Sequence, residues 1–320
     1  MSAKENRALR IVFMGTPDFA VGSLKALLRA GFNVVGVITA PDRPAGRGRK
    51  IQESAVKRFA KEKEIPILQP TKLKSEVFLK ELRELEANLQ VVVAFRMLPQ
   101  VVWQMPEYGT FNLHASLLPQ YRGAAPINWA IINGETETGV TTFFIDEKID
   151  TGHIILQESE VILPSDSAGS LHDRLMVKGS QLVVETCRLI AEGDLETKPQ
   201  KHFTKVKQAP KIHKDTCRID WTEPLDKIHD HIRGLSPYPG AWTFLVHNDE
   251  QMTLKVFASR KEFVEHDQKI GAILSNKKSL KVATKNGCLE LLEIQIPGKR
   301  RMKTSEVLQG FQLNESSHMR

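Results

Sequence analysis

The stretch RIVFMGTPDFAVGSLKALLRAGFNVVGVIT, residues 10–39, decides the fold expected for this chain. Residues 10–15 form an apolar run typical of a buried strand, and residues 33–39 form a second one. Between them, residues 19–30 carry apolar side chains at helical spacing, and Gly31 ends this helix. Two buried strands joined by a helix predict a right-handed crossover in a mostly parallel sheet with both faces covered.

The same alternation continues along the first half of the chain. Helices are expected near residues 54–63, 75–86 and 165–189, and strands near residues 65–68, 89–95, 108–113, 140–145 and 154–161. We therefore expect a Rossmann-like α/β domain over residues 1–191. Its first strand-to-helix turn, Gly15-Thr16-Pro17-Asp18, lacks the G-x-G-x-x-G pattern, so no bound nucleotide is expected.

The second half has a different pattern. Residues 192–210 are polar and rich in lysine, which predicts a linker. A helix at residues 224–235 precedes five short β-prone segments at 241–247, 252–258, 271–274, 280–283 and 288–295. Five short strands separated by turns favour a small C-terminal barrel of OB type over residues 211–320, a fold that often binds nucleic acid.

Composition excludes several classes of protein. At 320 residues, with 41% hydrophobic and 26% charged residues, the chain resembles a two-domain globular enzyme. It contains no run of 18 apolar residues and begins without a signal-type apolar segment, so we expect a cytoplasmic protein that does not enter a membrane. Cys187, Cys217 and Cys288 lie far apart in the sequence, which argues against a disulfide framework and against a metal site.

The net charge of +7 is concentrated in the last 120 residues. Residues 201–320 hold 21 lysines and arginines against 14 aspartates and glutamates, whereas residues 1–200 hold 24 of each. This asymmetry indicates either a polyanionic partner or a solvated lysine-rich surface.

Two polar side chains lie at the end of the apolar run at residues 108–113. Asn112 and His114 are two residues apart, so on a strand they share a face, near the edge where α/β sheets bind ligands. In one interpretation, Asn112 caps a turn and His114 is a hydrogen-bonded core residue. In the other, the amide stabilises an oxyanion while His114, oriented by Asp150 and biased toward its charged form, handles a proton during acyl transfer.

The order of the surrounding residues distinguishes these interpretations. Asn112-x-His114-x-Ser-Leu-Leu-Pro, then Arg122-Gly123, then Asp150-Thr-Gly resembles the signature of the folate-dependent formyltransferases. The resemblance implies that Asn112, His114 and Asp150 are catalytic. It also implies that Ser116, Leu117, Leu118 and Pro119 border the site of 10-formyltetrahydrofolate.

A second segment is implicated by the same resemblance. In this family the loop after the third apolar strand borders the pterin, which here corresponds to Arg96, Met97 and Leu98. The chain departs from the family there, because it lacks the usual Tyr-Gly pair.

The basic segment PDRPAGRGRK, residues 41–50, carries four positive charges and one negative charge. Its glycines and prolines disfavour helix and strand, and it is either a solvated loop or one that conforms to phosphates. It resembles the inserted loop of the family members that act on methionyl-tRNA. That resemblance implies that Arg43, Arg47, Arg49 and Lys50 bind the acceptor stem.

The resemblance implies transfer of the formyl group of 10-formyltetrahydrofolate, a cosubstrate, to the α-amino group of initiator methionyl-tRNA, and we expect a monomeric enzyme. Two alternatives stay open at this point. A formyltransferase acting on an amino sugar or a ribonucleotide amine would keep Asn112, His114 and Asp150. A nonenzymatic RNA-binding protein would explain the basic barrel and leave those three residues without a role.

Overall fold

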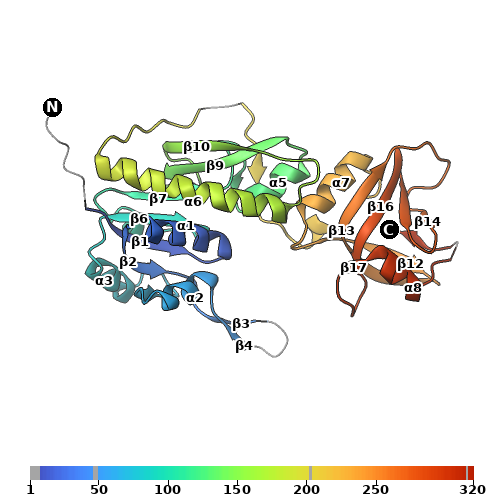
Figure 1. Cartoon of the computed structure of the whole chain (residues 1–320), viewed down its shortest axis with the longest axis horizontal. Coiled ribbons are helices and arrows are strands. Elements are labelled where there is room, and N and C mark those ends of the chain that lie inside the picture. The colour runs from blue at the N-terminus through green and yellow to red at the C-terminus, as the bar shows by residue number, and fades with distance from the viewer. Residues whose placement is uncertain (1–7, 46–49, 202–203, 315) are drawn as a thin grey trace. The chain divides into compact units, whose positions relative to one another are not determined.

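A computed structural model of the chain describes residues 8–45, 50–201, 204–314 and 316–320 (Figure 1). It divides into two compact units. Unit 1 lies within Met1–Gly123, Thr138–Glu160 and His172–Gln208, and unit 2 within Ala124–Glu137, Val161–Leu171 and Ala209–Arg320. Two internal segments therefore group with the C-terminal part of the chain. The boundaries predicted from the sequence stay predictions for the functional domains.

The central sheet of unit 1 has seven strands in the order β10-β9-β7-β6-β1-β2-β5. The strands are β1 (Arg10–Gly15), β2 (Asn33–Ile38), β5 (Ile67–Leu68), β6 (Leu89–Val93), β7 (Thr110–His114), β9 (Glu137–Phe144) and β10 (Ile154–Val161). Strands β5, β2, β1, β6 and β7 are parallel, and β9 is antiparallel to β7. The mostly parallel sheet expected from the sequence is confirmed.

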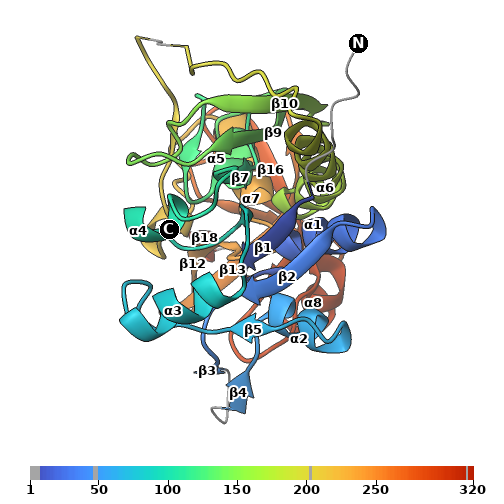
Figure 2. The ribbon, with the colours of Figure 1, turned by 90° about the vertical axis from the view of Figure 1, so that its left-hand side faces the viewer.

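Helices cover both faces of this sheet (Figure 2). Helices α1 (Asp18–Arg29) and α6 (Ala168–Glu192) lie on one face, where a Cβ on Gly22 would come within 2.8 Å of Met176. Helices α3 (Glu76–Glu84) and α4 (Gln100–Trp103) pack on the other, with Phe78 and Val102 buried against Val12. Ser54 and Ser75 accept hydrogen bonds from the first turns of α2 (Ala55–Glu62) and α3, which explains where these two helices begin.

The basic segment differs from its prediction as an irregular loop. Its ends form a short antiparallel hairpin, β3 (Arg43–Ala45) with β4 (Lys50–Gln52). Pro44 lies opposite Ile51 in a ribbon of only two strands, where a residue without an N–H is tolerated at an open edge. We refer to residues 43–52 as the basic hairpin; residues 46–49, at its tip, lie outside the described part of the chain.

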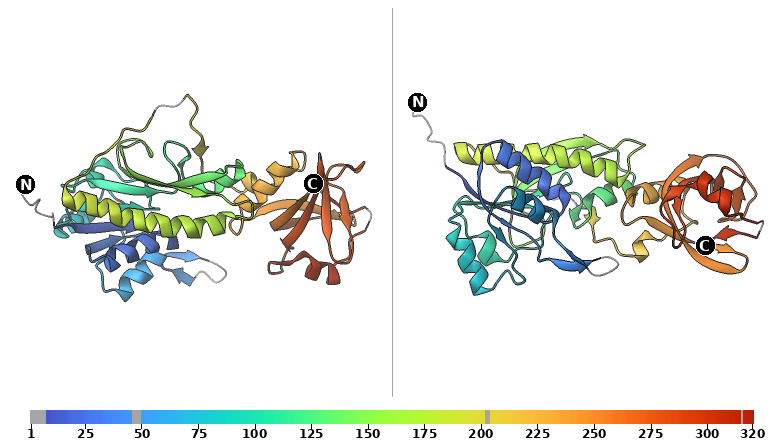
Figure 3. Two further views of the ribbon diagram at one scale, coloured as in Figure 1. Left: turned by 45° about the horizontal axis from the view of Figure 1, so that its top comes forward. Right: turned by 60° about the horizontal axis from the view of Figure 1, so that its bottom comes forward.

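Unit 2 contains the predicted antiparallel barrel, which closes as a ring in the right panel of Figure 3. Its strands are β12 (Ala241–His247), β13 (Glu250–Glu262), β14 (Ile273–Ser275), β15 (Leu280–Thr284), β16 (Gly287–Gln295), β17 (Met302–Lys303) and β18 (His318–Met319). The last two strands and α8 (Thr304–Gly310) were not expected from the sequence. A bridge between Ala272 and His318 joins the two ends of the sheet. Glycine is required at position 271, because a Cβ would lie 2.5 Å from the Met319 carbonyl oxygen and the φ of Gly271 is +85°.

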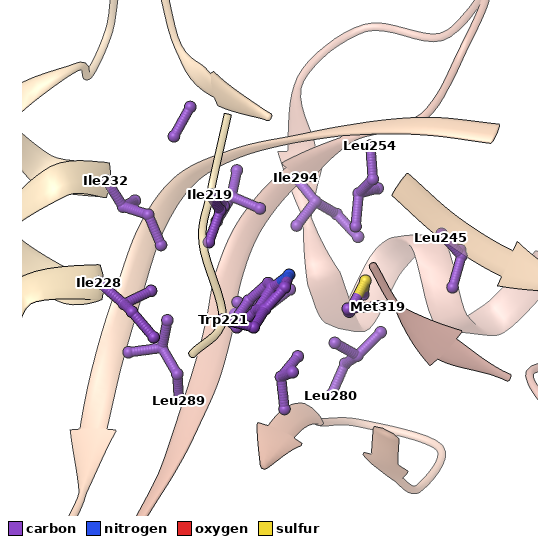
Figure 4. Close-up of a cluster of buried hydrophobic side chains, with 14 of the residues drawn as sticks. Ile219, Trp221, Ile228, Ile232, Leu245, Leu254, Leu280, Leu289, Ile294 and Met319 are labelled. Atoms are coloured by element: carbon purple, nitrogen blue, oxygen red, sulfur yellow. The ribbon is translucent and has the colours of Figure 1, made fainter. Parts of the chain in front are cut away.

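Trp221 lies at the centre of the barrel core (Figure 4). Its indole N–H donates to Thr243 Oγ1 at 2.8 Å, so the one polar atom of this large side chain is satisfied. Helix α7 (Leu225–Gly234) covers the core through Ile228 and Ile232 and packs against α5 (Pro126–Ile132). The remaining short elements are β8 (Arg122–Gly123), β11 (Gln208–Ala209) and the 3-10 turn η1 (Asp215–Cys217).

In the described ranges, no helix combines the length and the apolar character needed to cross a membrane.

Candidate active site

Strand β7 positions the first two candidate residues. Asn112 and His114 alternate with the buried Phe111 and Leu113, so their side chains leave the same face of the strand. Asn112 is half-buried, and none of the residues that the structure describes hydrogen-bonds to its side chain. Its amide is therefore available to a ligand.

The ring of His114 is fixed by a backbone carbonyl. His114 is only 6% exposed, and its Nε2 lies 2.8 Å from the carbonyl oxygen of Tyr121. Because a carbonyl can only accept, Nε2 carries the hydrogen, and in the neutral ring Nδ1 carries the lone pair. Nδ1 in turn faces Asp150 Oδ2 at 3.8 Å. A proton on Nδ1 would convert this approach into an ion pair.

The loop that carries Asp150 is held at several points. Asp150 Oδ2 accepts a hydrogen bond from the Gly123 N–H at 2.9 Å, which fixes the carboxylate beside the ring. Asp150 has a left-handed φ of 55°, a conformation that aspartate tolerates better than most residues. Thr151 donates to Asp146, and a Cβ on Gly152 would lie 1.7 Å from the Phe144 carbonyl oxygen. The Asp-Thr-Gly pattern is thus what this tight loop requires.

Gln200 is a contributor that sequence reasoning missed. Its Nε2 donates to the carbonyl oxygens of Asp150 and Gly152, both at 2.9 Å, and its Oε1 accepts from Arg122. The residue lies within the segment predicted to be a linker, part of which pairs with β10 through Lys198 and Ile154. No local pattern marks Gln200, because its partners are about fifty residues away in the sequence.

The segment Ser116 to Pro119 forms a closed turn next to His114. The Ser116 hydroxyl donates to the Gln120 carbonyl, and the Leu118 carbonyl accepts from Gln157. The side chains of Ser116, Leu118 and Pro119 are buried, and Leu117 is half-buried. A ligand at this segment would therefore meet mainly its backbone and Leu117.

The three residues after β6 have three different environments. Arg96 donates to the carbonyl oxygens of Pro70 and Thr71, and partial burial, with a smaller effect of the nearby Arg43, lowers its pKa. Leu98 is buried in the core, whereas Met97 is 65% exposed. Met97 is thus the member of this set whose side chain is free to contact a ligand.

Of the predicted tRNA-binding residues, Arg43 begins β3 and is exposed. Lys50 begins β4, and Arg47 and Arg49 lie outside the described residues. Across the described residues, no group of three or more histidine, cysteine, aspartate or glutamate side chains could hold a metal ion.

Comparisons with known proteins identify the family of the chain. The formyl transferase family matches residues 9–187, and the formyl transferase C-terminal domain matches residues 211–312. A methionyl-tRNA formyltransferase of Flavobacterium johnsoniae is 55% identical over 309 residues, covering 97% of this chain and 98% of the relative. One from Bacteroides thetaiotaomicron is 54% identical over 316 residues, covering 97% and 98%.

Solved structures share the fold at lower identity. A sugar 3N-formyl transferase, crystallised with dTDP and 5-N-formyl-THF, superposes with a TM-score of 0.65 at 22% identity and covers 92% of this chain and 100% of its own. HypX from Aquifex aeolicus, in complex with tetrahydrofolic acid, superposes with a TM-score of 0.61 at 19% identity. The match covers 94% of this chain and 47% of the HypX chain. Because it is 54–55% identical to these two relatives over 97% of its length, the chain belongs to the methionyl-tRNA formyltransferase family.

Proposed function

We propose that this enzyme transfers a formyl group from 10-formyltetrahydrofolate to the α-amino group of initiator methionyl-tRNA, with Asn112, His114 and Asp150 as its catalytic residues. The observation that carries this proposal is that Asn112, whose amide has no partner among the described residues, shares a face of β7 with His114, whose Nδ1 lies 3.8 Å from the Asp150 carboxylate. Family membership supports the reaction, and the site geometry supports the roles of the residues.

The reaction needs no acylated enzyme residue, because the amine of the acceptor is itself the nucleophile. A C–N bond forms between the amine and the formyl carbon, the bond from that carbon to N10 breaks, and one proton passes from the amine to N10. Asn112 donates its amide N–H to the oxygen on which negative charge develops. An amide that has no partner within the described protein needs no rearrangement to do so.

His114 handles the proton through Nδ1. Since Nε2 is committed to the Tyr121 carbonyl, Nδ1 is the nitrogen that can take the proton of the attacking amine. The Asp150 carboxylate, 3.8 Å away, stabilises the resulting imidazolium, which then returns the proton to the leaving nitrogen. Neither side chain has to move, because Tyr121 and Gly123 hold them from outside.

The formyl donor is proposed to lie between the Ser116 to Pro119 turn and the loop that carries Arg96, Met97 and Leu98. The side chains of Ser116 and Leu118 are buried, so recognition there would use backbone groups. Met97 offers an exposed apolar surface to the flat pterin, whereas Arg96 and Leu98 support the loop from behind. No metal ion is required for this chemistry.

The acceptor is proposed to bind through the basic hairpin and the C-terminal barrel. Arg43, Arg47, Arg49 and Lys50 supply the positive charges of the hairpin. On the barrel, Lys214 and Arg218 are exposed and lie over the rings of Trp242 and Phe244. Neither side chain forms an ion pair with a carboxylate among the described residues, so both charges are available to phosphates. We propose that the enzyme is a monomer and acts in the cytoplasm, where charged tRNA is present.

One assay tests the reaction and the acceptor together. The protein is incubated with 10-formyltetrahydrofolate and either charged initiator tRNA, an amino-sugar nucleotide or a ribonucleotide amine, and formyl transfer is measured. Transfer to methionyl-tRNA alone is expected. Comparable transfer to a small amine would instead favour one of the other branches of the fold.

Asn112→Ala tests the catalytic assignment. Removing one oxyanion donor lowers kcat by about a hundred- to a thousandfold, with folate binding preserved. Asn33→Ala, which removes an exposed amide at the start of β2, is the control and should retain activity. An Asn112→Ala enzyme within a few fold of wild type would show that the amide has no part in the chemistry.

A further inference from the structure

The basic hairpin is joined to the body of unit 1 by its two feet, residues 39–42 before β3 and residues 53–54 after β4. Lys57, on helix α2, reaches both feet. Its ammonium lies 2.5 Å from Asp42 Oδ2 in the first foot and 3.3 Å from Glu53 Oε1 in the second. The Lys57 side chain is only 12% exposed, unlike most lysines.

Other hydrogen bonds support the same junction. Gln69 donates to the Ala40 carbonyl and to Asp42 Oδ1, at 2.8 and 2.9 Å, so both oxygens of Asp42 have partners. Across the feet, the hydroxyls of Thr39 and Ser54 are 2.7 Å apart. The hydrogen bond from Lys57 holds the pKa of Asp42 below its ordinary value and raises that of Lys57, so both stay charged near neutral pH.

We propose that Lys57 is a positioning residue for tRNA binding, which acts by clamping both feet of the basic hairpin to helix α2. Arg43 follows Asp42 directly, so the clamp fixes the direction in which β3 leaves the sheet and presents Arg43. A two-stranded ribbon has little stability of its own, and its orientation therefore depends on its anchor. This inference rests on the proposed binding of tRNA by the hairpin.

Lys57→Met removes the charge and keeps most of the length and apolar contact of the side chain. The KM for methionyl-tRNA is expected to rise about tenfold, while kcat at saturating tRNA and the KM for 10-formyltetrahydrofolate stay within about twofold. Lys57→Arg should recover most of the loss, because a guanidinium can still join two carboxylates. Asp42→Asn, which keeps a side chain able to bond to Gln69 but removes the ion pair, should reproduce the effect of Lys57→Met.

Lys61→Met is the matched control. Lys61 lies one turn further along α2 and forms an ion pair with Glu53 in the second foot; among the described residues, no ion pair joins it to Asp42 in the first foot. Its replacement removes the same charge and should leave the KM for tRNA within about twofold, since exposed ion pairs contribute little.

A double-mutant cycle of Lys57→Met with Arg43→Ala tests whether Lys57 acts through Arg43. If Lys57 works by presenting Arg43, the two changes are not additive, and Lys57→Met adds little once Arg43 is gone. Additive losses, or a fall in kcat and folate affinity together, would overturn the inference. An unchanged KM for tRNA in Arg43→Ala would overturn the inference, because Lys57 would then have no Arg43 contact to present. If Arg47→Ala/Arg49→Ala also leaves that KM unchanged, the hairpin is not the tRNA contact, and the failure belongs to the proposed function.

Discussion

At the active site, a single backbone hydrogen bond decides which nitrogen of His114 can do chemistry. The Tyr121 carbonyl occupies Nε2, so Nδ1 is left to face Asp150. Asp150 is then placed by groups outside the three proposed catalytic residues, namely the Gly123 N–H and Gln200. The geometry of the proposed site thus depends on hydrogen bonds from Tyr121, Gly123 and Gln200.

Gln200→Leu tests this dependence. The buried amide holds the carbonyl oxygens of Asp150 and Gly152, and its loss should let the carboxylate drift from Nδ1. We expect kcat to fall about ten- to a hundredfold, because small misplacements of catalytic groups are costly, with both KM values near wild type. Gln295→Leu, which removes an amide bonded to Lys299 on the barrel surface, is the control for steady-state kinetics. Unchanged kcat in Gln200→Leu would mean that Asp150 is placed without it.

At the scale of elements, the outer face of β12 differs from the rest of the barrel surface. Lys261 and Lys281 are paired with Asp226 and Glu262, so their charges are largely neutralised. Lys214 and Arg218 rest instead on Trp242 and Phe244, where cation–π contacts hold a cation without neutralising it. The outer face of β12 thus presents two cations held over aromatic rings, whereas the charges of Lys261 and Lys281 are ion-paired.

The double variant Lys214→Ala/Arg218→Ala should weaken tRNA binding at every salt concentration tested. Each lost phosphate contact lowers the slope of log affinity against log salt by about one. The double variant Lys261→Ala/Lys281→Ala removes the same net charge from paired positions and is expected to leave the slope close to wild type. Equal slopes for the two double variants, measured by filter binding, would assign the effect to net charge rather than to the β12 face.

At the scale of the whole molecule, each unit has its own buried core, and each core contains free cysteine. Cys187 lies in unit 1, and Cys217 and Cys288 lie in unit 2, all of them buried. Burial raises the pKa of all three thiols, so the reactive thiolate is scarce at pH 8. The reactivity of these thiols therefore reports the unfolding of each unit separately.

Iodoacetamide at pH 8 should modify none of the three cysteines in the native protein within minutes. As the urea concentration is raised, Cys217 and Cys288 should become reactive together when unit 2 unfolds, whereas Cys187 should become reactive when unit 1 unfolds. Mass spectrometry measures the modification of each cysteine. Rapid alkylation of any of them in native buffer would contradict the burial described for that thiol.

The sequence by itself determined the features that are written in local patterns. The alternation of β1, α1 and β2 predicted the parallel sheet, because periods of two and 3.6 residues are properties of neighbouring side chains. The spacing of Asn112 and His114 placed both on one face of β7 for the same reason. The family resemblance then added Asp150, whose distance from His114 no local pattern could give.

Tertiary structure alone decided the rest. Gln200 reaches Asp150 across fifty residues, Ala272 meets His318 to close the barrel, and Lys57 joins two feet that lie on either side of the basic hairpin. The sequence likewise did not predict the pairing of β3 with β4, because the prolines and glycines of this segment each disfavour a strand. Such contacts depend on where the chain returns in space, and the physical reason that sequence patterns miss them is that periodicity records only which side of its own element a residue faces.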